Sequence, residues 1–285
     1  MKKGTTLFFI AALAFFAIGG DAHAARVKFM PQPYTGADAG HVVLSLAATD
    51  LPKSGVFNYA LYLANFDTKE VIKLFWQRKR PDALAFGMGL VDITYPSGDP
   101  GKPDFTNGEQ PGVVFVRALP PGRYGVLNFE SWANFYGNIK PFMLKKNFYA
   151  PFTIKSGVAT YLGEFASYPI SLKRYMGHDV KEPHKMVVAT YYVVSDQMER
   201  DMALAKARVP AITQDEKAIV DPANVKSPFI RAASIPKNDI AVIDAEIPTA
   251  PVSEWEHVKN IIFDSMPILD PESLEKLDAE KATAP

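Results

Sequence analysis

The sequence predicts a mainly β protein, in which an antiparallel β-sandwich is followed by a helical, partly irregular C-terminal extension. Three observations carry this prediction. About eight short segments between residues 40 and 195 are rich in β-branched and aromatic residues and are separated by turn residues. The same stretch shows no helical pattern that could serve as a crossover between parallel strands. Helical patterns begin only after residue 195.

The first strands are expected at residues 42–49, 56–66 and 71–76, where apolar and aromatic residues dominate. The strongest β pattern follows at residues 113–129, where two extended runs flank a turn at Pro120-Pro121-Gly122. We expect the Tyr124 ring to point inward at the start of the second run, with its hydroxyl reaching the backbone.

Later strands are predicted at residues 152–155 and 159–165, which we interpret as a hairpin around Ser156-Gly157, and at residues 186–194. Residues 197–208 then predict a helix. Asp196 and Glu199 have the spacing of a capping box, and Pro210 stops the pattern. The β-sandwich domain is therefore expected to span residues 25–210.

The N-terminus predicts a cleavable signal peptide at residues 1–24. A basic start is followed by an apolar run at residues 7–18 and by Ala22-His23-Ala24, a small-residue site suited to cleavage after Ala24. The apolar run is too short to span a bilayer as a helix. We therefore expect a periplasmic or secreted protein with no transmembrane span after cleavage.

Charge is unevenly distributed, although the chain as a whole is neutral. Residues 26–210 contain 22 Lys and Arg against 16 Asp and Glu, a net charge of +6, whereas residues 211–285 contain 7 against 14, a net charge of −7. The acidic, proline-rich extension at residues 211–285 is therefore a separate segment by composition. Neither part is basic enough to indicate nucleic-acid binding, and the absence of cysteine excludes disulfides and thiolate metal sites.

Part of the chain resembles a known family. The run Leu119-Pro120-Pro121-Gly122-Arg123-Tyr124 resembles the turn-and-strand signature of prealbumin-like β-sandwiches, including carboxypeptidase regulatory domains. Together with the segments at residues 152–157 and 160–165, it is similar to a family of exported bacterial proteins of unknown function. The resemblance covers about residues 40–210. It implies a prealbumin-like or Ig-like sandwich and supplies no catalytic residue.

Aromatic and basic residues gather between residues 132 and 149, and this segment is the first candidate binding site. Aromatic residues bury well, so these rings are expected to cap one end of the sandwich core; the functional alternative is an exposed loop that stacks sugars or binds an anionic polymer or a peptide. The candidate binding residues here are Trp132, Phe135, Tyr136, Lys140, Lys145 and Lys146.

The C-terminal extension supplies the second candidate site. A capping box at Ser253 and Glu256 predicts a helix whose apolar face is formed by Trp255, Val258, Ile262 and Met266. This face would dock on the protein's own basic body or bind a partner, or the extension would stay disordered.

Chemical sites have only weak support in the sequence. His178, Asp179 and His184 share one segment and form a candidate metal site, although their spacing matches no metal motif and the alternative is a solvated loop. Glu130 and Glu164 are the only carboxylates considered as a hydrolase pair. No nucleophile elbow or phosphate-binding loop is present, and we expect no cofactor.

The function expected from these features is a non-enzymatic periplasmic or secreted binding or assembly module with a protein or envelope partner. The alternative is a carbohydrate- or peptidoglycan-binding accessory domain that uses the aromatic–lysine segment. A hydrolase with scattered catalytic groups is a third possibility.

Overall fold

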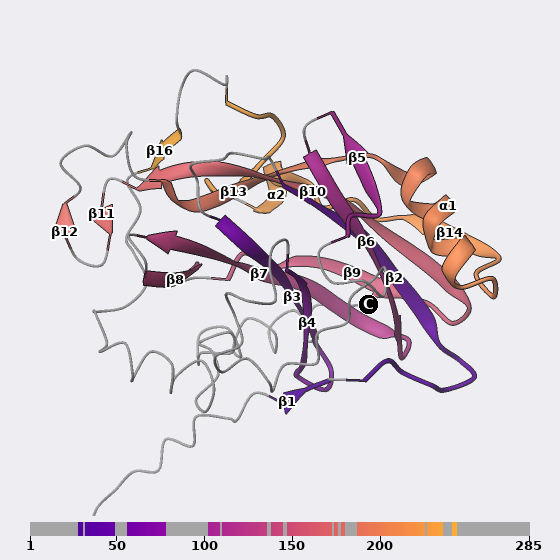
Figure 1. Cartoon of the computed structure of the whole chain (residues 1–285). Helices are drawn as coiled ribbons and strands as arrows, with labels where there is room; N and C mark the ends of the chain where they lie inside the picture. Colours follow the sequence, from indigo (N-terminus) through magenta and orange to yellow (C-terminus); the bar gives the residue numbers. More distant parts are fainter. Residues whose placement is uncertain are drawn as a thin grey trace, which may run out of the picture.

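The computed structural model describes residues 28–30, 32–48, 56–77, 102–108, 110–135, 138–144, 147–172, 174–175, 178–179, 187–225, 227–235 and 241–243. These residues form a mainly β protein with two large sheets and one helix of 11 residues (Figure 1). The prediction of a mainly β fold is therefore confirmed.

The first sheet, sheet A, contains six strands, five of them in the order β1-β4-β3-β7-β8. The sixth, β9, pairs with the first half of the long strand β7, while β8 pairs with its second half. The bounds are β1 (Lys28–Phe29), β3 (Val56–Asn65), β4 (Glu70–Gln77), β7 (Gly122–Phe135), β8 (Asn138–Met143) and β9 (Ala150–Ile154).

The second sheet, sheet B, contains eight strands, six of them in the order β15-β13-β10-β2-β6-β5. Strands β14 and β16 both pair with the long strand β10. The bounds are β2 (Gly40–Ala48), β5 (Phe105–Asn107), β6 (Gln110–Leu119), β10 (Val158–Leu172), β13 (Val187–Ser195), β14 (Gln214–Lys217), β15 (Ile230–Arg231) and β16 (Ala241–Ile243).

The smaller elements lie around these sheets. Helix α1 (Met198–Arg208) follows β13, and the short helix α2 (Pro222–Val225) precedes β15. A separate two-stranded sheet pairs β11 (Arg174–Tyr175) with β12 (His178–Asp179). Within the described part of the chain, no helix is long and apolar enough to cross a membrane.

The main core lies between the two sheets. Alternate residues of each strand face it, as the twofold repeat of a β-strand requires. Leu44 and Leu46 of β2 contribute from sheet B, while Leu61 of β3 and Leu74 of β4 contribute from sheet A. All four side chains are buried, and their removal from water is the main source of stability for this pair of sheets.

The predicted position of Tyr124 is confirmed. Its side chain is fully buried, and its hydroxyl donates a hydrogen bond of 2.9 Å to the carbonyl oxygen of Pro120. The ring stacks on Phe152 of β9 at a centroid distance of 5.7 Å. Tyr124 thus fixes the corner at which the chain leaves β6 in sheet B and enters β7 in sheet A.

The expectation of purely antiparallel sheets is wrong, because the sheets are mixed. β2 and β10 are parallel neighbours in sheet B, and β10 also pairs in parallel with β14 and β16. Much of the chain between β2 and β10 forms strands of sheet A. The opposite sheet therefore supplies the long connection that a parallel pair needs, in place of a helix.

The expected hairpin around Gly157 is also wrong. β9 pairs with β7 in sheet A, whereas β10 pairs with its neighbours in sheet B. Gly157 has the positive φ of 72° expected of a turn residue, but this turn carries the chain from one sheet to the other.

The predicted helix at residues 197–208 is confirmed as α1. Its start is shifted slightly from the capping-box prediction: Gln197 occupies the N-cap position, and the Asp196 carboxylate accepts a hydrogen bond from the Met198 backbone N–H at 3.1 Å. The helix ends before Pro210, as expected. It packs on β10, β2 and β6 and so covers the outer face of sheet B.

Candidate functional site

A buried polar cluster lies where the first turn of α1 meets the outer face of sheet B. Asp201 is completely buried there. Its carboxylate accepts hydrogen bonds from the Ser45 hydroxyl at 2.6 Å and from the Tyr161 hydroxyl at 3.0 Å. Tyr161 in turn accepts a bond of 3.0 Å from the backbone N–H of Gln197. Strands β2 and β10 are thereby tied to the N-terminus of the helix.

Arg200 extends this cluster to a second carboxylate. Its guanidinium donates to Asp201 at 2.6 Å and to Glu164 of β10 at 2.7 Å, and its Cζ lies 3.5 Å from the centroid of the Phe105 ring. Burial lowers the pKa of Arg200, but the hydrogen bonds to Glu164 and Asp201 outweigh this effect and raise it above its ordinary value. The guanidinium therefore stays charged and offsets one of the two carboxylates.

The chemistry of this cluster favours attachment of the helix over catalysis. Both Asp201 and Glu164 are buried and paired with Arg200. Burial raises the pKa of the Tyr161 hydroxyl, and the neighbouring Asp201 charge raises it further, so Tyr161 remains a neutral donor. Each group is thus engaged in holding α1 against the sheet.

The C-terminal end of α1 is anchored by a second ion pair, which also protects a sheet edge. Arg208 lies 2.5 Å from the Asp104 carboxylate and donates to the Val114 carbonyl oxygen at 2.6 Å. Asp104 accepts a bond of 2.7 Å from the Val114 backbone N–H. Both backbone groups of Val114 on β6 are therefore occupied by side chains, which prevents another strand from pairing there.

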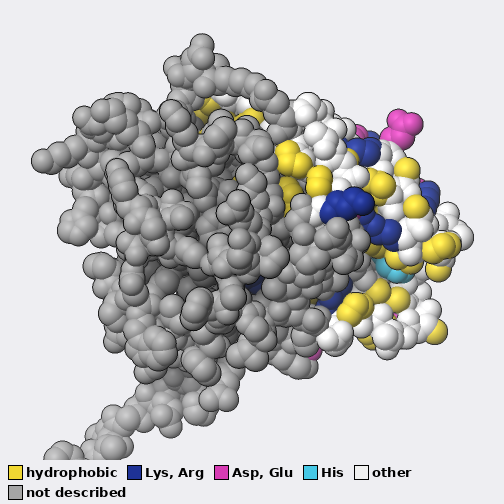
Figure 2. All heavy atoms as spheres, viewed as in Figure 1, with side chains coloured by type: hydrophobic (Ala, Val, Ile, Leu, Met, Phe, Trp, Pro, Cys, Tyr) yellow, Lys and Arg dark blue, Asp and Glu magenta, His cyan; other side chains and the backbone are white. Residues whose placement is uncertain are grey.

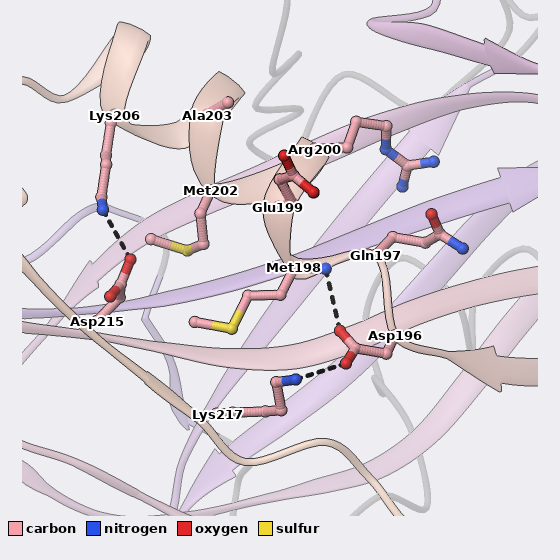
Figure 3. A pocket seen from close by; sticks show the side chains of 10 residues that line it. All are labelled: Asp196, Gln197, Met198, Glu199, Arg200, Met202, Ala203, Lys206, Asp215 and Lys217. Carbon is pink, nitrogen blue, oxygen red and sulfur yellow. Dashed lines mark hydrogen bonds and ion pairs between the residues drawn. The ribbon is translucent and has the colours of Figure 1, made fainter.

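An open groove runs beside α1, between the helix and β14 (Figure 3). Met198, Met202 and Ala203 form its apolar part. Two ion pairs link the helix to β14 across the groove: Lys206–Asp215 at 2.7 Å and Lys217–Asp196 at 2.5 Å. Because these charges satisfy each other, the groove offers no excess of either sign to a ligand.

A second polar cluster lies on the outer face of sheet A. Glu130 of β7 accepts hydrogen bonds from the Tyr62 hydroxyl and from the Lys73 ammonium group, the latter at 3.0 Å. The Lys73 Nζ also lies 5.3 Å from the centroids of the Tyr62 and Phe75 rings. Burial raises the pKa of Tyr62 well above its usual value, and the Glu130 charge adds to this effect.

The two carboxylates considered as a hydrolase pair lie far apart in the fold. Glu130 projects from the outer face of sheet A toward Tyr62 and Lys73, whereas Glu164 projects from the outer face of sheet B toward Arg200. The core lies between the two carboxylates, so they cannot act on one bond, and the pair considered from the sequence does not form a hydrolase site.

The predicted aromatic–lysine loop is largely a β-hairpin. Trp132 and Phe135 lie on β7 and Lys140 lies on β8, where Trp132 is opposite Pro141 and Phe135 is opposite Asn138. The interpretation of this segment as a loop is therefore wrong. Consecutive strand residues alternate between faces, so Trp132 and Lys140, which is opposite Ala133, lie on opposite faces of the hairpin. Tyr136, Lys145 and Lys146 fall outside the described residues.

The candidate metal residues are only partly described. His178 and Asp179 form β12, paired with β11, and His184 lies outside the described residues. Among the described residues, no group of three or more His, Cys, Asp or Glu side chains could hold a metal ion. The four candidate binding residues of the extension, Trp255, Val258, Ile262 and Met266, also lie outside the described part of the chain.

Surface composition on the described part of one face is mixed. Figure 2 shows basic and hydrophobic side chains interspersed there, with few acidic groups in view. This distribution agrees with the net positive charge of residues 26–210.

Comparisons with known proteins add little to this description. No protein-family model and no curated protein matches the chain. One solved structure that matches is the crystal structure of a leucine-rich repeat protein from Bacteroides thetaiotaomicron, at 10% identity and a TM-score of 0.26. The match covers 46% of this chain and 14% of that one, and it is too weak to indicate a shared fold.

Proposed function

We propose that the protein is an exported, non-enzymatic binding or assembly module that contacts a protein or envelope partner in the periplasm or outside the cell. We further propose that its two sheets form a prealbumin-like sandwich and that the extension beyond residue 243 takes part in the contact. The N-terminal export pattern supports the proposed location, and the mainly β architecture is compatible with the proposed sandwich.

The main structural support for the proposal is the hairpin formed by β7 and β8. It lies at the end of sheet A, because β8 is the last strand in the order of that sheet. The register places Lys140 opposite Ala133, next to Trp132. Because consecutive strand residues alternate between faces, a partner that wraps around this sheet edge meets an aromatic position on one face and a basic position on the other, two residue types common in protein interfaces.

Strand addition at this edge is disfavoured by Pro141, which lies within β8 and lacks a backbone N–H. We therefore expect partner binding through side chains of the hairpin and not through continued β-pairing. Carbohydrate or peptidoglycan binding remains the second candidate, because an aromatic residue at a sheet edge, such as Trp132, suits stacking on a sugar ring.

The experiment is chemical crosslinking in intact cells followed by affinity capture. It compares the full chain with a version that ends at Ile243, which keeps every described strand, and with the Trp132→Ala and Trp132→Phe variants. Capture of a partner by the full chain and its loss in Trp132→Ala, with recovery in Trp132→Phe, supports a hairpin interface. Loss in the shortened chain alone assigns the contact to the extension.

The second candidate is tested in parallel by retention on peptidoglycan and on immobilised glycans. Retention that disappears in Trp132→Ala, without any captured protein, would replace the assembly proposal by the carbohydrate-binding one. If no variant captures a protein and none is retained on a glycan, the binding-module proposal is wrong.

A further inference from the structure

Four buried side chains in the core between the sheets have hydrogen-bonding atoms that no described group satisfies. These atoms are the indole nitrogen of Trp76 and the hydroxyls of Ser131, Thr190 and Tyr192. Each of the four residues is at most 2% exposed. They differ in this respect from Asp201 and Tyr161, which are equally buried but fully engaged in hydrogen bonds.

Two of these atoms come from neighbouring positions of sheet A. Tyr59 of β3 lies directly opposite Trp76 of β4 on one side and opposite Ser131 of β7 on the other. The Tyr59 and Trp76 rings stack with their centroids 5.6 Å apart. Ser131, Tyr59 and Trp76 therefore form a row across three strands, on the face that points toward sheet B.

The other two atoms come from β13 in sheet B. The Tyr192 ring meets Phe129 edge to face at a centroid distance of 4.7 Å, and Phe129 lies two residues before Ser131 on β7. Thr190 lies two residues before Tyr192 and so shares its face of the strand. Both sheets thus direct unpaired polar atoms into the same region of the core.

Tyr192 is an uncharged donor at physiological pH. Burial raises the pKa of its hydroxyl well above the usual value, and the nearby Tyr59 raises it further, while Thr190 lowers it. Tyr59 approaches Tyr192 across the core from the opposite sheet, and the Thr190 hydroxyl is close enough to lower the Tyr192 pKa in the manner of a hydrogen bond, but neither hydroxyl has a partner that meets the full distance and angle limits of one.

Buried polar atoms without partners are rare in folded proteins, because each one loses its hydrogen bonds to water. Where several occur together, they normally bind ordered water or a ligand. An indole N–H can only donate, whereas hydroxyls both donate and accept. None of the four groups carries a charge, so the matching molecule is uncharged and has at least one acceptor oxygen.

We propose that Trp76, Ser131, Thr190 and Tyr192 form an inter-sheet polar site, which binds a small uncharged molecule through a hydroxyl or carbonyl oxygen. Water is the smallest molecule of this class, and a small alcohol or amide is the organic alternative. The rings of Tyr59 and Phe129 lie beside these groups, since Tyr59 stacks on Trp76 and Phe129 contacts Tyr192 edge to face. This proposal does not depend on the function proposed above.

The test replaces each hydroxyl by an apolar side chain of similar shape in the full chain: Ser131→Ala, Thr190→Val and Tyr192→Phe. If the site is occupied, each variant loses a hydrogen bond, and we expect the unfolding temperature to fall by about 2–4 °C. Pairs of substitutions should cost less than the sum of the single ones, because the same bound molecule is lost only once.

The opposite result overturns the proposal. If the hydroxyls are truly unpaired, their removal relieves a desolvation cost, and the unfolding temperature rises or stays unchanged. Tyr191→Phe is the reference variant, because the neighbouring Tyr191 hydroxyl has a known partner, the Ile235 backbone N–H at 2.8 Å. Its effect gives the loss expected from one broken hydrogen bond in this strand.

Native mass spectrometry of the full chain distinguishes the two sources of the bound oxygen. An added mass that is present in the unaltered chain and absent from Tyr192→Phe identifies an organic molecule. The bare protein mass, together with lowered unfolding temperatures of the three variants, assigns the site to water. Both outcomes support the site, whereas unchanged unfolding temperatures exclude it.

Discussion

At the scale of single residues, the most consequential side chain in the described structure is Asp201. A buried carboxylate is tolerated only when paired and hydrogen bonded, and Asp201 meets this condition through Ser45, Tyr161 and Arg200. We predict that Asp201→Ala lowers the free energy of unfolding by about 3–5 kcal/mol, because it leaves the buried hydroxyls of Ser45 and Tyr161 without their acceptor and leaves Arg200 paired with Glu164 alone. Urea unfolding followed by circular dichroism measures this loss.

The matched control for this prediction is Asp196→Asn. Asp196 is exposed and pairs with Lys217 at the surface, where water already screens the two charges. Its substitution should leave the urea midpoint nearly unchanged. Equal effects of the two substitutions would show that the buried cluster does not hold the helix.

Asp201 also shows what sequence reasoning missed at this scale. The residue lies three positions after Met198 and four before Ala205, so it falls on the apolar stripe of α1 that packs against sheet B. A charged residue on a buried stripe indicates a buried polar cluster. Its partners Ser45 and Tyr161 could not be found in this way, because a serine or tyrosine in a β-strand has no distinctive pattern.

Buried tyrosines give the protein a defined response to alkaline pH. Burial raises the pKa of Tyr124 to about 12, and it raises those of Tyr62 and Tyr192 well above their ordinary value. A phenol whose pKa is raised by folding favours the folded state at low pH, and this advantage is lost as the pH rises above 10, the pKa of an unfolded tyrosine. We therefore predict a falling unfolding temperature between pH 10 and 12.

Absorbance at 295 nm provides the second readout of this prediction. The buried tyrosines should ionise only when the chain unfolds, so the late part of the phenolate signal should coincide with the loss of circular dichroism. Complete ionisation near pH 10 in a folded protein would contradict the assigned burial.

At the scale of elements, a bulge in β10 assembles the polar cluster. The register between β10 and β2 shifts between Tyr161 and Glu164, and Gly163 takes a positive φ of 109° there. Without this shift, two residues three positions apart would point to opposite faces of the sheet. The bulge instead places both Tyr161 and Glu164 on the outer face, beside α1.

We predict that Gly163→Ala lowers the free energy of unfolding by about 1–3 kcal/mol and loosens α1. An added Cβ would lie 3.1 Å from Val194 and 3.3 Å from Ile219, at a φ that side chains rarely adopt. Thermal unfolding measures the loss. Gly157→Ala is the control, because Gly157 also has a positive φ but has open space around it. If both substitutions lowered the free energy of unfolding equally, the contacts of the added Cβ with Val194 and Ile219 would not be the cause of the loss at Gly163.

Individual elements were more predictable than their pairing. Helix α1 was found because its apolar stripe and its stop at Pro210 are local signals, and β2 and β3 because their residues suit a buried strand. The turn at Gly157 was located correctly but assigned to a hairpin. A local turn signal does not specify whether the next strand joins the same sheet, since that choice depends on contacts distant in sequence.

At the scale of the whole molecule, the described residues between Pro210 and Ile243 are part of the packed structure. Strands β14, β15 and β16 join sheet B, and Val220 and Phe229 lie in the main core. These strands are two to four residues long, so they lack the alternating pattern by which the longer strands were predicted. The change in charge at residue 210 therefore marks a change in surface composition and not the end of the core.

This placement makes two shortened chains behave differently. A chain that ends at Pro210 loses three strands of sheet B and exposes the core that Val220 and Phe229 cover, so we predict that it aggregates or unfolds well below the temperature of the full chain. A chain that ends at Ile243 retains every described element and should keep a cooperative transition. Thermal unfolding by circular dichroism checks both. If the chain ending at Pro210 were equally stable, the strands between residues 214 and 243 would not contribute to the stability of sheet B.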